Sequence, residues 1–296
     1  MASKRSFKAI PFLVPLLILI SIFVLYPIAA TIYYSLYDPR SSSLSLNNYV
    51  TVLTSTNPLY ALISRSVSTT PPWGALLHNI LWVTIHVPVV TLLGMAIAYI
   101  LKFYVRGSTL IKAMLFTGIV IPPAIGGLIV RFIFDAQIGL VPKAFSLLGI
   151  EPLSRTWTSY PETALLALIL GSIWIWLGFS VTVFSAALET IPRSHVEAAK
   201  LFGASDWQIF YRVIAPQLKP AAVIVVVMTA LWDMKIFDIV YASTQGGPGG
   251  SSTVLALVMY DYFSRALDYY RAAAVAVILT LAVIPVIFIA IRRMEK

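Results

Sequence analysis

The sequence predicts an all-α integral membrane protein with six transmembrane helices, and three observations support this. Of its 296 residues, 59% are hydrophobic and only 11% are charged, whereas soluble domains carry about 25% charged residues. Six apolar stretches are each long enough to cross the hydrocarbon core, which is roughly 30 Å thick, as a helix. Basic residues gather near the ends of these stretches, as they do around membrane spans. The net charge of +9 therefore reflects membrane topology, and we expect contact with membrane lipid and no nucleic-acid partner.

The predicted spans are residues 10–36, 75–101, 110–134, 164–188, 221–242 and 272–291. The first follows Lys4, Arg5 and Lys8 and has the charge pattern of a signal peptide. Its length of 27 residues and its lack of a small-residue cleavage site favour a retained helix instead. We expect residues 1–296 to form a single transmembrane domain.

The lysine and arginine residues predict the orientation of the chain. With a cytoplasmic N-terminus, 13 of the 21 basic residues lie in the two termini, in the connection after the second span and in the loop 189–220. The positive-inside rule then places both termini and this loop in the cytoplasm. The predicted protein is a multi-pass component of the plasma or inner membrane.

Metal binding and catalysis are not expected. The chain has no cysteine, and His78, His86 and His195 are too few and too scattered for a metal centre, so a structural role is expected for them. The G-x4-G-K-[ST] phosphate loop is absent from the sequence. We therefore predict no enzymatic activity and no cofactor in this chain.

The loop 189–220 concentrates charged residues in a protein that has few. Ser194 and Glu197 have the spacing of a capping box, and Ser205 and Gln208 repeat it. Gly203 lies between them, where a left-handed residue could end the first of two short helices. Apolar residues at spacings of three and four form a stripe: Val196, Ala199, Gly203, Trp207, Phe210 and Ile214. The residues alone leave two interpretations open: a docking surface for a partner, or helix caps that pack on the protein's own spans.

The pattern Glu197-Ala198-Ala199, then Gly203, with Pro216 thirteen residues after the glycine, resembles the coupling loop of importer-type ABC permeases. Other segments resemble the sugar-transporter branch of that family in the same order, namely Pro11 to Pro15, Leu46 to Tyr49, Ile121 to Pro123, Phe237 to Tyr241 and Thr244 to Gly249. The resemblance covers nearly the whole chain and is to the first-type subunit, similar to the larger maltose permease subunit or its glycerol-phosphate counterpart.

This resemblance implies a type I ABC importer permease fold with a cytoplasmic coupling helix, in its compact six-helix form. The implied function is that of a membrane subunit of an ATP-driven sugar importer, forming half of the translocation pathway. The implied partners are a second, related permease subunit in a heterodimer, two ABC ATPase subunits that bind ATP and Mg, and an extracellular substrate-binding protein. The residues implied to couple to the ATPase are Glu197, Ala198, Ala199, Gly203, Ala204, Trp207 and Pro216.

The fifth predicted span carries Asp233, Lys235 and Asp238, and ionisable groups in a membrane usually face a cavity or a partner. A carboxylate beside an indole suits a sugar, since the acid accepts hydroxyl hydrogen bonds and the ring covers the apolar sugar face. The resemblance implies that eight positions contact or flank bound sugar: Ser172, Ile175, Trp176, Phe179, Thr229, Trp232, Asp233 and Ile236. Trp176 replaces a usual glycine, which predicts a narrower cavity and a smaller sugar.

Less specific interpretations of these residues stay open. Lys235 and Asp238 are three residues apart and could neutralise each other, and the tryptophans could serve packing alone. An alternative function is an ion-coupled secondary transporter for a small polar solute, in which Asp233 and Asp238 would carry the coupling ion. That alternative leaves the resemblance of the 189–220 loop unexplained.

Overall fold

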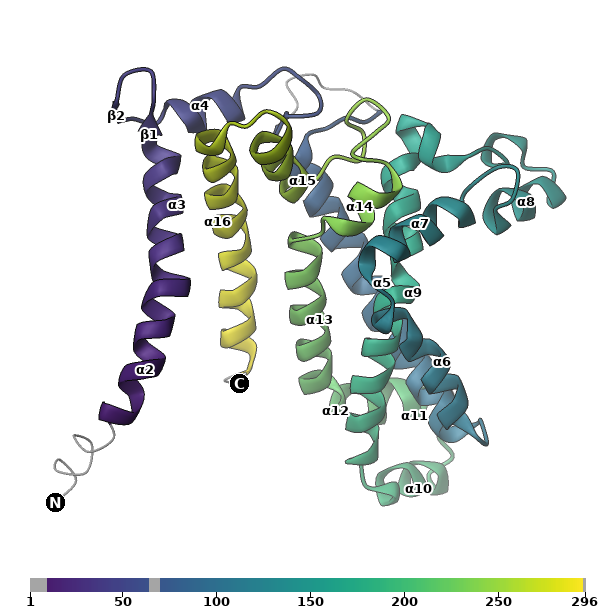
Figure 1. The fold of residues 1–296 in the computed structure, drawn as a ribbon. Helices are drawn as coiled ribbons and strands as arrows, with labels where there is room; N and C mark the ends of the chain where they lie inside the picture. Colours follow the sequence, from purple (N-terminus) through teal and green to yellow (C-terminus); the bar gives the residue numbers. More distant parts are fainter. Residues whose placement is uncertain (1–9, 64–69, 295–296) are drawn as a thin grey trace, which may run out of the picture.

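Proline and glycine residues at the edges of the apolar stretches set many of the helix boundaries in the computed structural model, which describes residues 10–63 and 70–294 (Figure 1). The first elements are α2 (Ile10–Ile20), the π-helical turn η1 (Ser21–Leu25), α3 (Tyr26–Leu36), β1 (Tyr37–Asp38), β2 (Ser43–Leu44) and α4 (Asn47–Leu53). There follow α5 (Ala75–Phe103), α6 (Ser108–Val120), α7 (Pro123–Ile133) and α8 (Leu140–Leu147).

The second half begins with two 3-10 turns, η2 (Glu151–Leu153) and η3 (Trp157–Ser159), and the long helix α9 (Pro161–Glu189). The next elements are α10 (Arg193–Leu201), α11 (Asp206–Ile209), the π-helical turn η4 (Phe210–Ile214), α12 (Ala215–Gln217) and α13 (Lys219–Met234). The last are α14 (Asp238–Ser243), α15 (Leu255–Tyr260), the π-helical turn η5 (Asp261–Arg265) and α16 (Tyr269–Met294). The two short strands form an antiparallel hairpin with Tyr37 opposite Leu44.

Three helical segments of the described chain are each long and apolar enough to cross a membrane: Leu13–Leu36, Ala75–Phe103 and Pro161–Glu189. They correspond to the first, second and fourth predicted spans. Two bent pairs of helices meet the same criterion only when each pair is counted as one span, namely Ser108–Val120 with Pro123–Ile133 and Asp206–Gln217 with Lys219–Met234. The sixth predicted span lies within α16, whose described apolar part is Tyr269–Pro285.

Two of the predicted spans are each divided into two helices. The stretch 110–134 divides into α6 and α7, which meet at an angle of 105°, because Pro123 cannot donate to the preceding turn and begins a new helix. The stretch 221–242 stops at Met234, and α14 begins only at Asp238. At its other end α13 meets the α11–α12 segment at an angle of 70°. Hydrophobicity averaged over a span does not reveal these breaks, because each lies within or beside a long apolar stretch.

The core lies where α5, α6, α9 and α13 pack together (Figure 1). Small residues let the backbones approach closely, as is common between membrane helices. A Cβ at Gly178 of α9 would overlap the backbone of Leu115 on α6, and one at Gly94 of α5 would overlap Ser180 on α9. The Ser180 hydroxyl also donates to the Val90 carbonyl across 3.0 Å, so α5 and α9 are held by a hydrogen bond as well as by packing.

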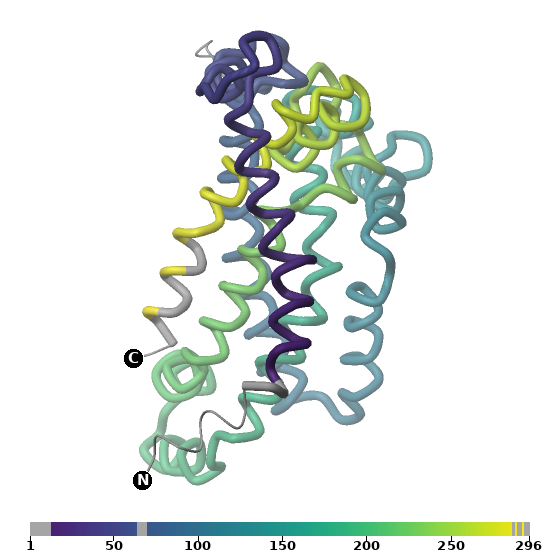
Figure 2. The backbone as a smooth tube through the Cα atoms, turned by 60° about the vertical axis from the view of Figure 1, so that its left-hand side comes forward, coloured from purple at the N-terminus to yellow at the C-terminus, as the bar shows by residue number. Residues whose placement is uncertain are grey.

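The N-terminal helix lies apart from this core. It packs beside α16 (Figures 1 and 2), and none of the most apolar window of Leu13–Leu36 is buried within the chain. The beginning of α2 and the end of α16 lie toward the same end of the molecule as α10 to α12, and the β1–β2 hairpin lies at the other end (Figure 1). The long apolar surface of α2 and α3 therefore requires lipid or another subunit to cover it.

Candidate functional site

The loop between α9 and α13 has a defined backbone geometry. Gly203 has φ of +78°, a left-handed conformation that favours glycine. The amide of Ala204 donates to the Ala199 carbonyl at 3.0 Å, and that of Gly203 donates to Lys200 at 2.9 Å. These two bonds are those of a Schellman motif, which satisfies the last carbonyls of α10. The prediction that Gly203 ends the first short helix is confirmed.

The capping boxes predicted on either side of Gly203 have different outcomes. The box at Ser205 is present: its hydroxyl accepts from the Gln208 amide at 3.3 Å, and the Gln208 side chain accepts from the Ser205 amide at 2.9 Å. The box at Ser194 is wrong, because Pro192 is the residue that precedes α10 and no side chain caps that helix. Ser194 and Glu197 lie inside α10 and are exposed.

The apolar stripe of this loop divides between two surfaces. Val196, Ala199 and Phe210 pack, together with the buried Ile214, against the end of α9 and the end of α5. Trp207 departs from the prediction, because 71% of its surface is exposed. Leu201 and Phe202 at the end of α10 are 88% and 93% exposed. One face of the loop therefore holds it to the membrane helices, while large apolar side chains project from the other.

The charged and small residues predicted for coupling lie on the same loop. Glu197 and Ala198 are exposed on α10, Ala204 is half-buried after the Gly203 turn, and Pro216 lies in α12. Trp207 also borders a cavity of about 280 Å³ between α5 and α11, lined by Ala96, Tyr99, Ile100, Tyr104, Asp206, Trp207 and Phe210. Exposed apolar groups beside a cavity are typical of a surface that another protein covers.

A second candidate site lies where α9 and α13 meet, farther from the loop. Trp176 and Trp232 stack with ring centroids 4.2 Å apart and ring planes 18° apart. Phe179 meets Trp232 edge-on, with centroids 5.0 Å apart. All three rings are half-buried. The structure thus brings together three of the residues predicted to bind substrate.

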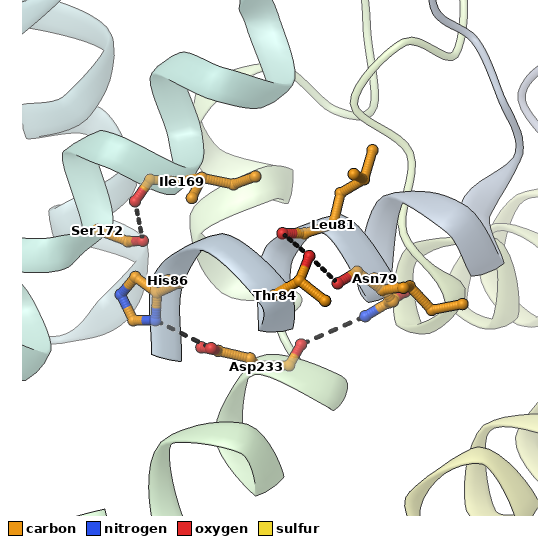
Figure 3. Close-up of polar contacts among 8 residues, drawn as sticks. Asn79, Leu81, Thr84, His86, Ile169, Ser172 and Asp233 are labelled. Carbon is orange, nitrogen blue, oxygen red and sulfur yellow. Dashed lines mark hydrogen bonds and ion pairs between the residues drawn. The ribbon is translucent and has the colours of Figure 1, made fainter. Parts of the chain in front are cut away.

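Asp233 faces a different helix from its neighbour Trp232. Its Oδ2 accepts a hydrogen bond at 2.9 Å from Nδ1 of His86 on α5 (Figure 3), and both side chains are fully buried. With Asp233 ionised, the carboxylate only accepts hydrogen bonds, and Nδ1 of His86 then carries the hydrogen. In this single chain Asp233 is therefore buried against His86, and it does not face an open cavity as we expected.

Asn79, two turns before His86 on α5, holds the end of α13. Its amide nitrogen donates to the carbonyls of Asp233 at 3.3 Å and Met234 at 3.2 Å (Figure 3 shows the first). Its amide oxygen accepts from the Leu255 amide at 2.9 Å. One buried side chain thus satisfies the end of α13 and the beginning of α15, where intrahelical partners are lacking.

The other residues predicted to bind sugar are in the core. The hydroxyl of Ser172 donates to Ile169 within its own helix at 2.8 Å (Figure 3), and Ile175 packs toward the glycines of α6 and α7. Ile236 is buried at the break after α13. Thr229 is fully buried one turn before Asp233, and its hydroxyl has no partner among the described residues.

Lys235 and Asp238 do not form the proposed neutralising pair. Both are exposed, and no ion pair joins them in the part of the chain that the structure describes. Their positions at the α13–α14 break explain this, since the backbone no longer follows the helical spacing that would bring i and i+3 together.

His86 and Asn79 are the residues of this site that sequence reasoning missed. A signal for His86 was available: an ionisable group in a predicted span needs a partner, and Asp233 in another span offers the complementary charge. Asn79 offered no comparable signal, because its role depends on the break at the end of α13. Within the described residues no group of three histidine or acidic side chains could hold a metal ion. The stacked indoles and the carboxylate suit a polar organic molecule.

The chain is similar to known proteins over most of its length. The model of the family described as "binding-protein-dependent transport system inner membrane component" matches residues 90–294. A probable ABC transporter permease protein of Pyrococcus horikoshii is 50% identical over 292 residues, which are 98% of this chain and 99% of that protein. The alpha-glucoside transport system permease protein AglF of Rhizobium meliloti is 30% identical over 293 residues, 96% of this chain and 82% of that protein.

A solved structure shares the fold. A chain from a bacterial ABC transporter that imports the acidic polysaccharide alginate superposes with a TM-score of 0.78 at 17% sequence identity. The match covers 99% of this chain and 96% of that one.

Proposed function

The chain belongs to the family of binding-protein-dependent transport system inner membrane components, and from this membership we propose that it is a transmembrane subunit of an ATP-driven sugar importer. It forms half of the translocation pathway and transmits the motion of a cytoplasmic ATPase. ATP and Mg are bound and used on separate subunits, because this sequence has no phosphate-binding loop.

The observation that carries the proposal is the loop from α10 to α12. A Schellman turn at Gly203 fixes the angle between its helices, its inner face packs on α5 and α9, and its outer face exposes Leu201, Phe202 and Trp207. An apolar, rigid projection of this kind suits insertion into a cleft on another protein. We assign the ATPase to this surface, with Glu197, Ala198, Ala199, Gly203, Ala204, Trp207 and Pro216 as its coupling residues.

The substrate we propose is a small sugar. One relative is named for alpha-glucoside transport and a structural neighbour for alginate import, so carbohydrates are the class that these names share. The half-buried rings of Trp176, Phe179 and Trp232 offer apolar faces to a sugar ring. The second indole of the stack occupies space on the α9 side, which favours a small substrate. Asp233 lies next to the stack in sequence and would accept a hydroxyl hydrogen bond.

The proposed assembly contains a second, related permease subunit, two ABC ATPase subunits and an extracellular binding protein. The uncovered face of α2 and α3 supports another membrane subunit, and the family description names dependence on a binding protein. We place both termini in the cytoplasm of a plasma or inner membrane, with the α10–α12 loop. Residues 1–296 then form one transmembrane domain.

Reconstitution tests this proposal. The complex of this chain, a second permease and the ATPase is placed in proteoliposomes, and labelled sugar is delivered by the binding protein. Uptake should require ATP on the ATPase side and should continue when an ionophore removes proton and sodium gradients. Uptake that collapses with an ionophore while ATP is constant would support the ion-coupled alternative, which family membership disfavours. A functional complex with two copies of this chain and no second permease would contradict the heterodimer.

A further inference from the structure

The polar groups between α5 and α13 are only half satisfied. His86 and Asp233 bond to each other through Nδ1 and Oδ2 at 2.9 Å. The remaining atoms of the pair, Nε2 of His86 and Oδ1 of Asp233, are buried and have no hydrogen-bond partner among residues 10–63 and 70–294. The Thr229 hydroxyl, one turn before Asp233 on α13, is also buried and has no hydrogen-bond partner among the described residues. Native proteins rarely leave such atoms buried and unpaired unless a ligand, a water or an ion uses them.

The carboxylate of Asp233 is held rigidly from α5. His86 fixes one of its oxygens, and Asn79 bonds the main-chain carbonyls of Asp233 and Met234. The backbone and the side chain of Asp233 are therefore both anchored to the same helix (Figure 3). Oδ1 is the carboxylate oxygen that makes no hydrogen bond among the described residues, and its orientation is fixed by the bond between His86 and Oδ2.

We infer that His86 is a positioning residue of the sugar site: by holding Oδ2 of Asp233, it presents Oδ1 to one hydroxyl group of the sugar. The inference rests on the proposed function and assigns a role in substrate selection to a residue of α5. His86 acts through Asp233, since its own contact is with the carboxylate. The hydroxyl donor that completes Oδ1 is either a sugar hydroxyl or a buried water, and the experiment below distinguishes the two.

The test compares the affinities of the native complex and of His86 variants for a parent sugar and for analogues that each lack one hydroxyl group. Binding of methyl α-glucoside and its four monodeoxy analogues to the purified, assembled complex is measured by calorimetry, without the binding protein. If Oδ1 accepts one sugar hydroxyl, the analogue that lacks this hydroxyl should bind the native complex about tenfold more weakly than the parent, as expected for the loss of one hydrogen bond to a charged group.

Two substitutions separate the ring nitrogens of His86. His86→Asn places an amide nitrogen where Nδ1 lies and should keep the tenfold discrimination. His86→Gln places its amide nearer the position of Nε2 and should bring the discrimination close to onefold, as should His86→Leu. If the leucine variant does not assemble, the asparagine and glutamine pair still gives the answer, because both keep a polar side chain in the buried space.

The matched control is His78, a buried histidine two turns earlier on α5. Its Nδ1 donates to the Thr253 carbonyl at 2.7 Å, and Nε2 accepts from the Trp73 amide at 3.1 Å, so it bonds backbone alone. His78→Leu should lower thermal stability and leave the discrimination between analogues at tenfold. A His86→Gln variant that weakens the parent and all analogues equally would assign His86 a purely structural role and overturn the inference.

The two ways of failing remain distinct. A native complex that binds the parent sugar but shows no preference among the analogues would identify water as the partner of Oδ1 and refute the role of His86, while the importer proposal would stand. A native complex that neither binds nor transports any glucoside would contradict the proposed sugar class, and the inference with it.

Discussion

The indole of Trp232 on α13 lies parallel to the indole of Trp176 on α9, with 4.2 Å between ring centroids. Trp232 therefore joins two helices that also meet through the edge of Phe179. Its neighbour Asp233 faces another helix, α5, where it bonds His86. Two adjacent residues of α13 thus contact different helices: Trp232 makes an aromatic contact with α9, and Asp233 makes a polar contact with α5.

Replacing Trp232 should show whether its ring serves sugar transport or only the assembly of the subunit with the ATPase. Trp232→Ala removes the ring pair, which is worth about 0.5–1.5 kcal/mol beyond burial of area, and removes the apolar face offered to the sugar. We expect sugar uptake by proteoliposomes to fall severalfold more than copurification of the ATPase. Trp232→Phe keeps a ring and serves as the control. Equal loss of uptake and ATPase binding in the alanine variant would show that Trp232 only stabilises the subunit.

Asp233→Asn removes the negative charge while it preserves size. The weakened hydroxyl bond should cost roughly 1–2 kcal/mol, or about tenfold in sugar affinity. The effect should be the same with and without a proton or sodium gradient, because the sugar is neutral. Native affinity and uptake in this variant would leave Asp233 with a structural role and move the substrate site elsewhere.

Gly203→Asp should abolish transport without preventing membrane insertion. A Cβ at this position meets no other atom within 4 Å, so the cost is the left-handed backbone alone, about 1–2 kcal/mol, together with a new charge on the docking face. The check is uptake compared with subunit abundance in membrane fractions. Gly203→Asn is the control, because asparagine tolerates this conformation better, and it should retain most uptake. Normal uptake by the aspartate variant would contradict the coupling assignment.

Phe202 offers a test of the docking surface that leaves the turn unchanged. Its side chain is 93% exposed, so Phe202→Ala should barely change the stability of the subunit. If the ring enters an ATPase cleft, its loss should weaken binding by about 2 kcal/mol, or some thirtyfold. Surface plasmon resonance of the ATPase on the nanodisc-embedded permease pair would measure this. Leu147→Ala on α8, with 84% of its surface exposed, should change nothing.

The sequence was informative where local chemistry decides the structure. The turn at Gly203 follows from glycine between two helical segments, and the cap at Ser205 follows from its spacing to Gln208. The long spans within α2–α3, α5 and α9 follow from continuous hydrophobicity. In each case the deciding interactions lie within a few residues of one another, so a pattern of residue types is sufficient.

Long-range contacts determined what the sequence could not predict. His86 is 147 residues from Asp233, and Asn79 is 176 residues from Leu255. The break after Met234 is stabilised by Asn79, which lies on another helix. Because this support comes from far away in the sequence, hydrophobicity alone predicted that the span would continue. The false capping box at Ser194 has a local cause, since Pro192 precedes α10 and starts the helix earlier than the pattern indicated.

The three hydrogen bonds of Asn79 also bear on how the subunit can change shape. They join the beginning of α5 to the last turn of α13 and the first turn of α15. Parting these elements would strand buried backbone groups at about 1–3 kcal/mol each. We therefore expect the beginning of α5, the end of α13 and the beginning of α15 to stay together as one unit when the subunit changes shape.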